Sequence, residues 1–176
     1  MRIAALIVLF ACPWHGSVSA QSVAETFRPL IGTWETQDTY HPVDGPPSVE
    51  AGVRTCHMAL RDQYLQCDTE AVNAEGTERS YRWMVNYNGI TERFEMLSIW
   101  SNVPFKSVSA LEALDERNGW WLTSVAHVGD DEEYPPGYSE IVMETPDRIV
   151  WTGRRVSEGV PPEDAPISFV ETWVRR

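Results

Sequence analysis

Basic residues are scarce in this sequence. Lys and Arg together number 14 against 26 for Asp and Glu, so the formal net charge is -12. A protein that binds nucleic acid takes much of its affinity from a basic surface, and docking on an anionic membrane needs a polybasic patch. We therefore expect no nucleic-acid partner and no electrostatic contact with a membrane.

Motifs for covalent catalysis and for cofactor binding are absent as well. The chain has no Gly-x-Ser-x-Gly, no Ser-x-x-Lys and no glycine-rich phosphate or dinucleotide loop, which argues against the hydrolase, kinase and dehydrogenase classes. The acidic run at residues 130–133 lacks the spacing of a calcium loop, so we interpret it as a solvated loop. We predict no metal site and assign no catalytic residue.

Helical periodicity is nearly missing too. Only residues 22–30 could form a turn or two of helix, and the rest alternates between short runs rich in Val, Thr, Tyr and Trp and breaks at Gly, Pro and Asn, as in strands. The predicted strands are residues 32–40, 49–60, 64–73, 77–87, 93–101, 106–115, 120–128, 138–145, 148–155 and 167–175. We predict an all-β fold, a single antiparallel up-and-down β-barrel of about ten strands, because closure removes both exposed edges.

The predicted connections differ between the two ends of such a barrel. Those after the second, fourth, sixth and eighth strands are tight, whereas three on the other side are longer and contain Pro46-Pro47, Pro135-Pro136 and Pro161-Pro162. Functional loops tend to gather at one end of a rigid scaffold. We expect the mouth of a cavity at the long-loop end, and the mixed polar and apolar faces of the strands favour a semi-polar interior.

The first twenty residues resemble a secretory signal peptide. A basic start at residues 1–2 precedes a ten-residue apolar run, and Val18, Ser19 and Ala20 form a small-residue cleavage site. We expect cleavage after Ala20, a barrel domain at residues 21–176, and an exported protein, either periplasmic or secreted. The apolar run is too short to span a bilayer. The alternative is lipidation at Cys12, against which the bulky Phe10 argues.

Cys56 and Cys67 lie in two predicted strands joined by residues 61–63. A hairpin centred between Arg61 and Asp62 pairs residues whose numbers add up to 123, and the two cysteines meet this condition. They would face each other across the ladder, where an oxidising compartment favours a disulfide. The alternatives are two free thiols or a metal pair, but no second Cys pair or His cluster supports zinc.

Residues 27–34 (FRPLIGTW) resemble the opening of lipocalin-like (calycin) barrels, in which a helical turn precedes a Gly-x-Trp motif, here Gly32 and Trp34. In that superfamily the Trp plugs the closed end and an Arg from the last strand packs over it. Residues 173–176 (WVRR) end the last predicted strand at the same end of the barrel, so Arg175, or its neighbour Arg176, matches this Arg.

The strand count and size are similar to those of the ten-stranded, nitrobindin-like members, and residues 87–100 and 139–155 also resemble secreted lipocalin-like domains. The resemblance implies binding of a small, apolar or amphiphilic molecule and occasionally catalysis. Nitrobindin-like proteins bind haem through a His on a late strand, and the last three predicted strands contain no His. We therefore predict no cofactor, with haem possible but not favoured.

The candidate ligand-binding residues are Tyr40, Arg82, Trp83, Trp100 and His127. An inward Arg82 would receive a ligand carboxylate; alternatively it is solvated or pairs with Glu95 on the neighbouring strand. Trp83 and Trp100 either contact a ligand or only pack, and His127 is a ligand contact, an acid–base group or an ordinary core histidine.

Four glutamates on predicted strands, Glu95, Glu140, Glu144 and Glu171, support a different hypothesis. A carboxylate that points into the barrel would have a raised pKa and could act as a general base; an outward Glu in water is the alternative. Three functions therefore remain open: a ligand-binding barrel, a barrel-type isomerase or cyclase that uses an enclosed carboxylate or His127, and a ligand-free interaction module of the cell envelope.

Overall fold

The structure of the chain is a computed structural model that describes residues 20–103, 106–114, 117–128, 137–156 and 159–176. Its elements in chain order are α1 (Ala20–Phe27), η1 (Arg28–Leu30), β1 (Gly32–Tyr40), β2 (Ser48–Ala59), β3 (Tyr64–Asn73), β4 (Glu78–Asn88), β5 (Arg93–Trp100), β6 (Lys106–Ala113), β7 (Gly119–Val128), β8 (Gly137–Thr145), β9 (Arg148–Arg155), η2 (Pro162–Asp164) and β10 (Ile167–Arg175). The predicted strands agree with these bounds to within two residues.

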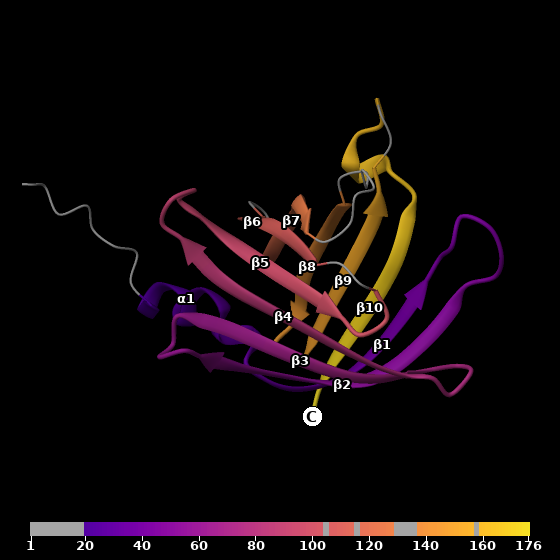
Figure 1. Cartoon of the computed structure of the whole chain (residues 1–176), viewed down its shortest axis with the longest axis horizontal. Helices are drawn as coiled ribbons and strands as arrows, with labels where there is room; N and C mark the ends of the chain where they lie inside the picture. The colour runs from indigo at the N-terminus through magenta and orange to yellow at the C-terminus, as the bar shows by residue number, and fades with distance from the viewer. Residues whose placement is uncertain (1–19, 104–105, 115–116, 129–136, 157–158) are drawn as a thin grey trace, which may run out of the picture.

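The ten strands form one closed barrel in which each strand pairs with its sequence neighbours and β10 pairs with β1. All pairings are antiparallel, so the predicted up-and-down barrel is confirmed. In Figure 1, α1 lies at the left, beside the tight β2–β3 and β4–β5 turns, and the β1–β2 and β3–β4 connections lie at the right. This lipocalin-like fold has one end covered by a helix and the other bordered by loops.

The hairpin of β2 and β3 has the predicted register. Ala59 pairs with Tyr64 and Cys56 pairs with Cys67, and the two cysteines form a disulfide. The turn between them places Leu60, Arg61 and Asp62 at positive φ. The bridge is completely internal, because both cysteines are buried in the core.

Apolar side chains fill the end of the barrel that α1 covers. Phe27 of α1 is fully buried, and its ring centre lies 5.1 Å from those of both Phe94 and Trp120, at the starts of β5 and β7. Trp34 of β1 is also fully buried and donates from Nε1 to the Leu30 carbonyl over 2.9 Å. These contacts make this end of the barrel a packed core.

Arg175 at the end of β10 covers this core from outside. Its guanidinium carbon lies 4.0 Å from the Trp34 ring centre, and it donates to the carbonyls of Ile31 (3.0 Å) and Pro29 (2.9 Å). Gly32 has φ +139°, and a Cβ there would lie 2.6 Å from Nη1 of Arg175. A glycine is therefore required both by the backbone conformation and by the approach of the guanidinium.

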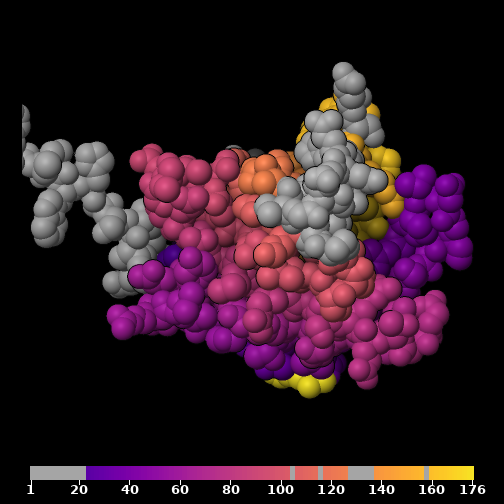
Figure 2. All heavy atoms as spheres, viewed as in Figure 1, coloured from indigo at the N-terminus to yellow at the C-terminus, as the bar shows by residue number. Residues whose placement is uncertain are grey.

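Figure 2 shows the β1–β2 and β3–β4 connections projecting at the right as separate lobes. Within the described residues, no helix has the length and apolar character needed to cross a membrane.

Candidate functional site: a cavity at the long-loop end of the barrel

A cavity of about 360 Å³ occupies the half of the barrel away from α1. Its walls come from all ten strands, with Thr36 and Trp83 toward the core and Tyr40 and Phe169 toward the loops. Aromatic rings supply much of the lining; one of them is Trp151 of β9, whose ring centre lies 5.7 Å from that of Phe169. The cavity has the size and mainly apolar lining of small-molecule sites.

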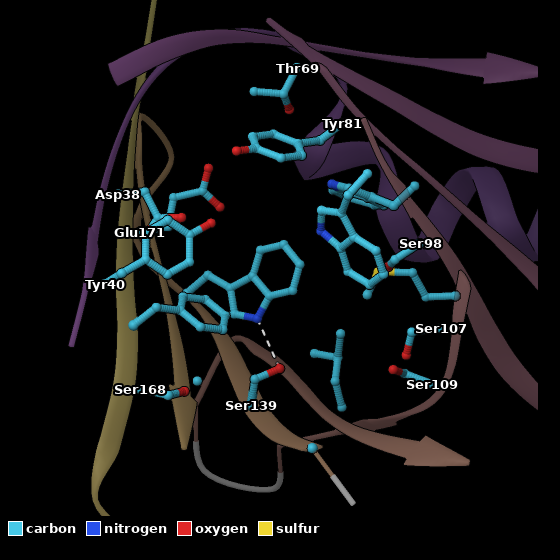
Figure 3. Close-up of a pocket in the computed structure, with 18 of the residues that line it drawn as sticks. Asp38, Tyr40, Thr69, Tyr81, Ser98, Ser107, Ser109, Ser139, Ser168 and Glu171 are labelled. Atoms are coloured by element: carbon cyan, nitrogen blue, oxygen red, sulfur yellow. Dashed lines mark hydrogen bonds between the residues drawn. The ribbon is translucent and has the colours of Figure 1, made fainter. Parts of the chain in front are cut away.

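Three carboxylates lie side by side across one wall of this cavity. Asp38 on β1 is directly opposite Glu50 on β2 and directly opposite Glu171 on β10. Glu50 and Glu171 are buried, and Figure 3 shows Asp38 and Glu171 close together beside Tyr40. Like charges on directly facing strands repel one another, so this wall needs cations, protons or a ligand to compensate it.

Arg54 compensates Glu171. Its Nη1 and Nη2 contact the two oxygens of the Glu171 carboxylate, each over 2.9 Å, and its Nε donates to Thr69 over 2.7 Å. The guanidinium stacks 4.3 Å from the ring centre of Trp173 and 5.8 Å from that of Trp83. Arg54 therefore forms a buried, two-point pair with Glu171 and a further hydrogen bond with Thr69. Few of its N–H groups remain to bind a ligand.

Arg79 and Tyr81 of β4 compensate Glu50. The Tyr81 hydroxyl donates to Oε1 of Glu50 over 2.5 Å, and Nη1 of Arg79 lies 3.1 Å from Oε2. Burial, first, and then this bond to Glu50 raise the pKa of Tyr81 well above its usual value. Tyr81 therefore stays protonated and acts as a hydrogen-bond donor at the wall of the cavity.

Asp38 forms no ion pair with an arginine or lysine among the described residues, unlike Glu50 and Glu171. Burial in the wall, and then the charge of Glu171, raise the pKa of its carboxyl to about 7, although the Tyr40 hydroxyl hydrogen-bonds to it. Its Oδ1 is buried and has no partner among the described residues. Asp38 can therefore gain or lose a proton near neutral pH, and its Oδ1 can accept a hydrogen bond from an incoming donor.

Hydroxyl groups line the opposite wall. Ser98, Ser107 and Ser109 of β5 and β6 are buried, and Figure 3 shows them across the cavity from Asp38 and Tyr40. None of the three makes a side-chain hydrogen bond within the part of the chain that the structure describes. Ser139 differs, because it accepts from Nε1 of Trp151 over 2.9 Å. Buried polar groups are usually hydrogen-bonded, so these hydroxyls are available to water or to a ligand.

Tyr40, Tyr81 and Trp100 form the neck of the cavity. The same three side chains also line a second pocket of about 340 Å³, which adjoins the cavity at the loop end and includes Arg79 and Asn102. A molecule passing from the outer pocket into the cavity must therefore contact these three rings. Their position agrees with the prediction that the mouth lies at the long-loop end.

The structure brings Tyr40, Trp83 and Trp100 together around the cavity. Arg82 borders it, but its guanidinium is half-exposed and pairs with Asp68 of β3 over 2.5 Å, not with Glu95. It stands on the opposite face of β4 from the inward Tyr81 and Trp83 because neighbouring strand residues alternate. His127 pairs with Ser107 in the β6–β7 ladder, and its side chain lies outside the described residues.

The four glutamates named from the sequence separate into two groups. Glu171 points into the barrel, whereas Glu95, Glu140 and Glu144 pair with arginines, Arg93, Arg117 and Arg148 respectively, which are each at least 40% exposed. These three are not candidates for an enclosed base.

Asp38, Glu50 and Arg54 were missed by the sequence analysis. The signal for Asp38 was the alternation along β1: if Trp34 points inward, then residues 36, 38 and 40 also point inward. Glu50 and Arg54 then follow from the β1–β2 register, in which paired residue numbers add up to 88. No cluster of three or more metal-ligating side chains occurs among the residues with described positions.

No family model matches the chain, and no curated protein matches it. Among solved structures, the chain is similar to Rv2717c from M. tuberculosis, with a TM-score of 0.64 and 11% identity over 88% of this chain and 97% of that one. It is also similar to the S-type phycobiliprotein lyase CPES from Guillardia theta, with a TM-score of 0.58 and 12% identity over 88% of this chain and 92% of that one. At these identities, the similarity shows a shared barrel fold.

Proposed function

We propose that this protein is an exported, nitrobindin-like barrel that binds or carries a small hydrophobic or amphiphilic molecule in its cavity. The observation that carries the proposal is the cavity of about 360 Å³, which combines aromatic walls with buried hydroxyls that have no side-chain hydrogen bond among the described residues. A site built only for stability would fill this volume with side chains, because empty space in a core is destabilising. The fold shared with a phycobiliprotein lyase is compatible with such a role.

Export is part of the proposal. The signal-peptide pattern of residues 1–20 motivates it, and the Cys56–Cys67 disulfide supports it because such bridges persist mainly in oxidising compartments. Mass spectrometry of the denatured protein from its own host tests this part: we expect a chain that begins at Gln21 and is two hydrogens lighter than the dithiol. A chain that begins at Met1 or carries lipid on Cys12 would contradict it.

Native mass spectrometry of the exported protein tests ligand binding. We expect an added mass that is lost on denaturation, and we expect the variant Ser109→Phe, which places a ring in the cavity, to lose it. Thr123→Phe is the matched control, since Thr123 lies on β7 with its side chain exposed. Retention of the added mass by Ser109→Phe would place the ligand elsewhere, and an unliganded wild type would favour the envelope interaction module.

A second candidate function is proton transfer to a bound substrate, as in a barrel-type isomerase or cyclase. The observation that favours it is Asp38, whose pKa of about 7 suits a general acid or base. Incubation of the extracted ligand with protein in heavy water tests it. We expect deuterium at a ligand carbon with the wild type and none with Asp38→Asn; equal exchange with both would exclude Asp38 as the base.

A further inference from the structure

We propose that the cavity selects a monocationic amine with an apolar body, and that the ammonium group binds at Asp38. This inference rests on the ligand-binding function proposed above and names the chemical class of the ligand. It follows from the charge balance of one wall, from the unpartnered atoms of that wall and from the rings around it.

The charge balance of the wall leaves one negative charge uncompensated. With Asp38 ionised, the wall holds three carboxylates, and two arginines face them: Arg54 on Glu171 and Arg79 on Glu50. Arg82 and Arg154 also border the cavity. Arg82 pairs with Asp68, and Arg154 keeps its positive charge but donates to the Ala165 carbonyl and is not among the charged groups that act on Asp38, which are Glu171, Arg54 and Glu50. A single positive charge brought by a ligand would balance the wall, whereas an anion would add a further repulsion.

The wall also has the hydrogen-bonding geometry for an ammonium group. Oδ1 of Asp38 is a buried acceptor with no partner among the described residues, and an ammonium offers three donors and no acceptor. The tyrosines around it, Tyr40 and Tyr81, keep their protons because burial, above all, raises their pKa values. Neither tyrosine therefore adds a charge that competes for the amine.

Aromatic rings near Asp38 favour the same ligand class. Tyr40 and Tyr81 border the neck together with Trp100, and Phe169 lies 6.1 Å from the Tyr40 ring centre. A cation is attracted to the faces of such rings, most strongly where water is excluded. The net charge of -12 adds a long-range attraction for cations over anions.

Three ligands with the same carbon skeleton test the inference: 4-phenylbutylamine, 4-phenylbutan-1-ol and 4-phenylbutanoate, titrated into the full exported protein by calorimetry at pH 8 and pH 5.5. We expect the amine to bind at least tenfold more tightly than the alcohol at pH 8, and the carboxylate to bind most weakly. The advantage of the amine should shrink about tenfold at pH 5.5, because the Asp38 carboxyl, with its pKa of about 7, is then mostly protonated.

Two variants locate the ammonium group. Asp38→Asn should remove the advantage of the amine over the alcohol and the pH dependence of that advantage. Asp62→Asn is the matched control, since Asp62 is exposed in the β2–β3 turn at the other end of the barrel, at a positive φ that Asn tolerates. The control should bind all three ligands as the wild type does.

The outcomes separate this inference from the function on which it rests. If the alcohol or the carboxylate binds as tightly as the amine, the cavity binds ligands but the ligand class is wrong. If the amine is preferred equally by Asp38→Asn, its ammonium group does not bind at Asp38 and the inference fails. If none of the three binds at millimolar concentration while the native mass spectrum still shows a bound molecule, the ligand class is wrong and the proposed function stands; if the native spectrum shows no bound molecule either, both are contradicted.

Discussion

Arg54 and Glu171 form a two-point ion pair at the floor of the cavity, with both N–O distances at 2.9 Å. The pair joins β2 to β10 across the inside of the barrel, over a sequence separation of 117 residues. It is enclosed by tryptophan rings on the core side, so it forms the boundary between the packed half of the barrel and the cavity. Its integrity is therefore needed for both folding and the shape of the site.

Replacing one partner of this pair should be strongly destabilising. Arg54→Met leaves Glu171 buried without its cation, and breaking such a pair typically costs about 3–5 kcal/mol. Urea unfolding followed by tryptophan fluorescence measures the loss. Arg82→Met is the matched control, because the Arg82–Asp68 pair lies on the outer face and exposed pairs contribute little. Equal losses in the two variants would contradict the assigned role of Arg54.

The contribution of Asp38 to the stability of the folded protein should fall as the pH rises from about 4 to about 7. The pKa of Asp38 is raised from 3.8 in the unfolded chain to about 7 in the folded one. The folded state therefore binds more protons in this interval, and a rise in pH favours unfolding. The full effect is at most ~4 kcal/mol.

To test this, the free energy of unfolding in urea is measured for the wild type and for Asp38→Asn at pH 4.5 and at pH 8. The quantity of interest is the difference between the two proteins at each pH. The difference is informative because Asp68 and Glu95 have lowered pKa values and contribute with the opposite sign. We expect Asp38→Asn to gain stability relative to the wild type as the pH rises. A difference that stays constant would show that Asp38 titrates normally.

Gly32→Ala should destabilise the closed end of the barrel by about 2–4 kcal/mol, which combines the strain of an unfavourable φ with lost Arg175 contacts. The new Cβ would displace the guanidinium of Arg175 from Trp34. Gly76→Ala is the control for the backbone alone, since Gly76 has φ +80° and open space around it. In a double-mutant cycle, we expect Gly32→Ala combined with Arg175→Ala to lose less stability than the sum of the two single variants, because both remove the same Arg175 contacts. Strictly additive losses would contradict the contact between residue 32 and Arg175.

Removal of the Cys56–Cys67 bridge should lower the free energy of unfolding by about 3 kcal/mol. Without the bridge, the unfolded chain regains the conformational entropy of the loop between the two cysteines. The thermal midpoint of the wild type should therefore fall when dithiothreitol is added. The variant Cys56→Ala/Cys67→Ala should have a lower thermal midpoint than the oxidised wild type, and the reductant should not change it. A wild type that does not respond to the reductant, although it denatures fully, would show that the thiols were free.

Most of the barrel was predictable because its determinants are local. The hairpin that carries Cys56 and Cys67 has a short turn, and a short turn sets the register of every pair in its hairpin. The same reasoning applied to the inward face of β1 would have found Asp38. It was harder to predict which face of β4 points into the barrel, and hence where Arg82 lies, because both faces of that strand combine polar and apolar residues.

The sequence by itself determined the all-β barrel, its strand bounds and the facing cysteines, since alternation and turn chemistry act between residues close in the chain. Only the tertiary structure decided that Asp38 stands opposite Glu171 and that Arg54 reaches the same carboxylate. Those contacts depend on how β10 meets β1, and the register of that closure follows from the tilt and stagger of the whole barrel, not from any single turn.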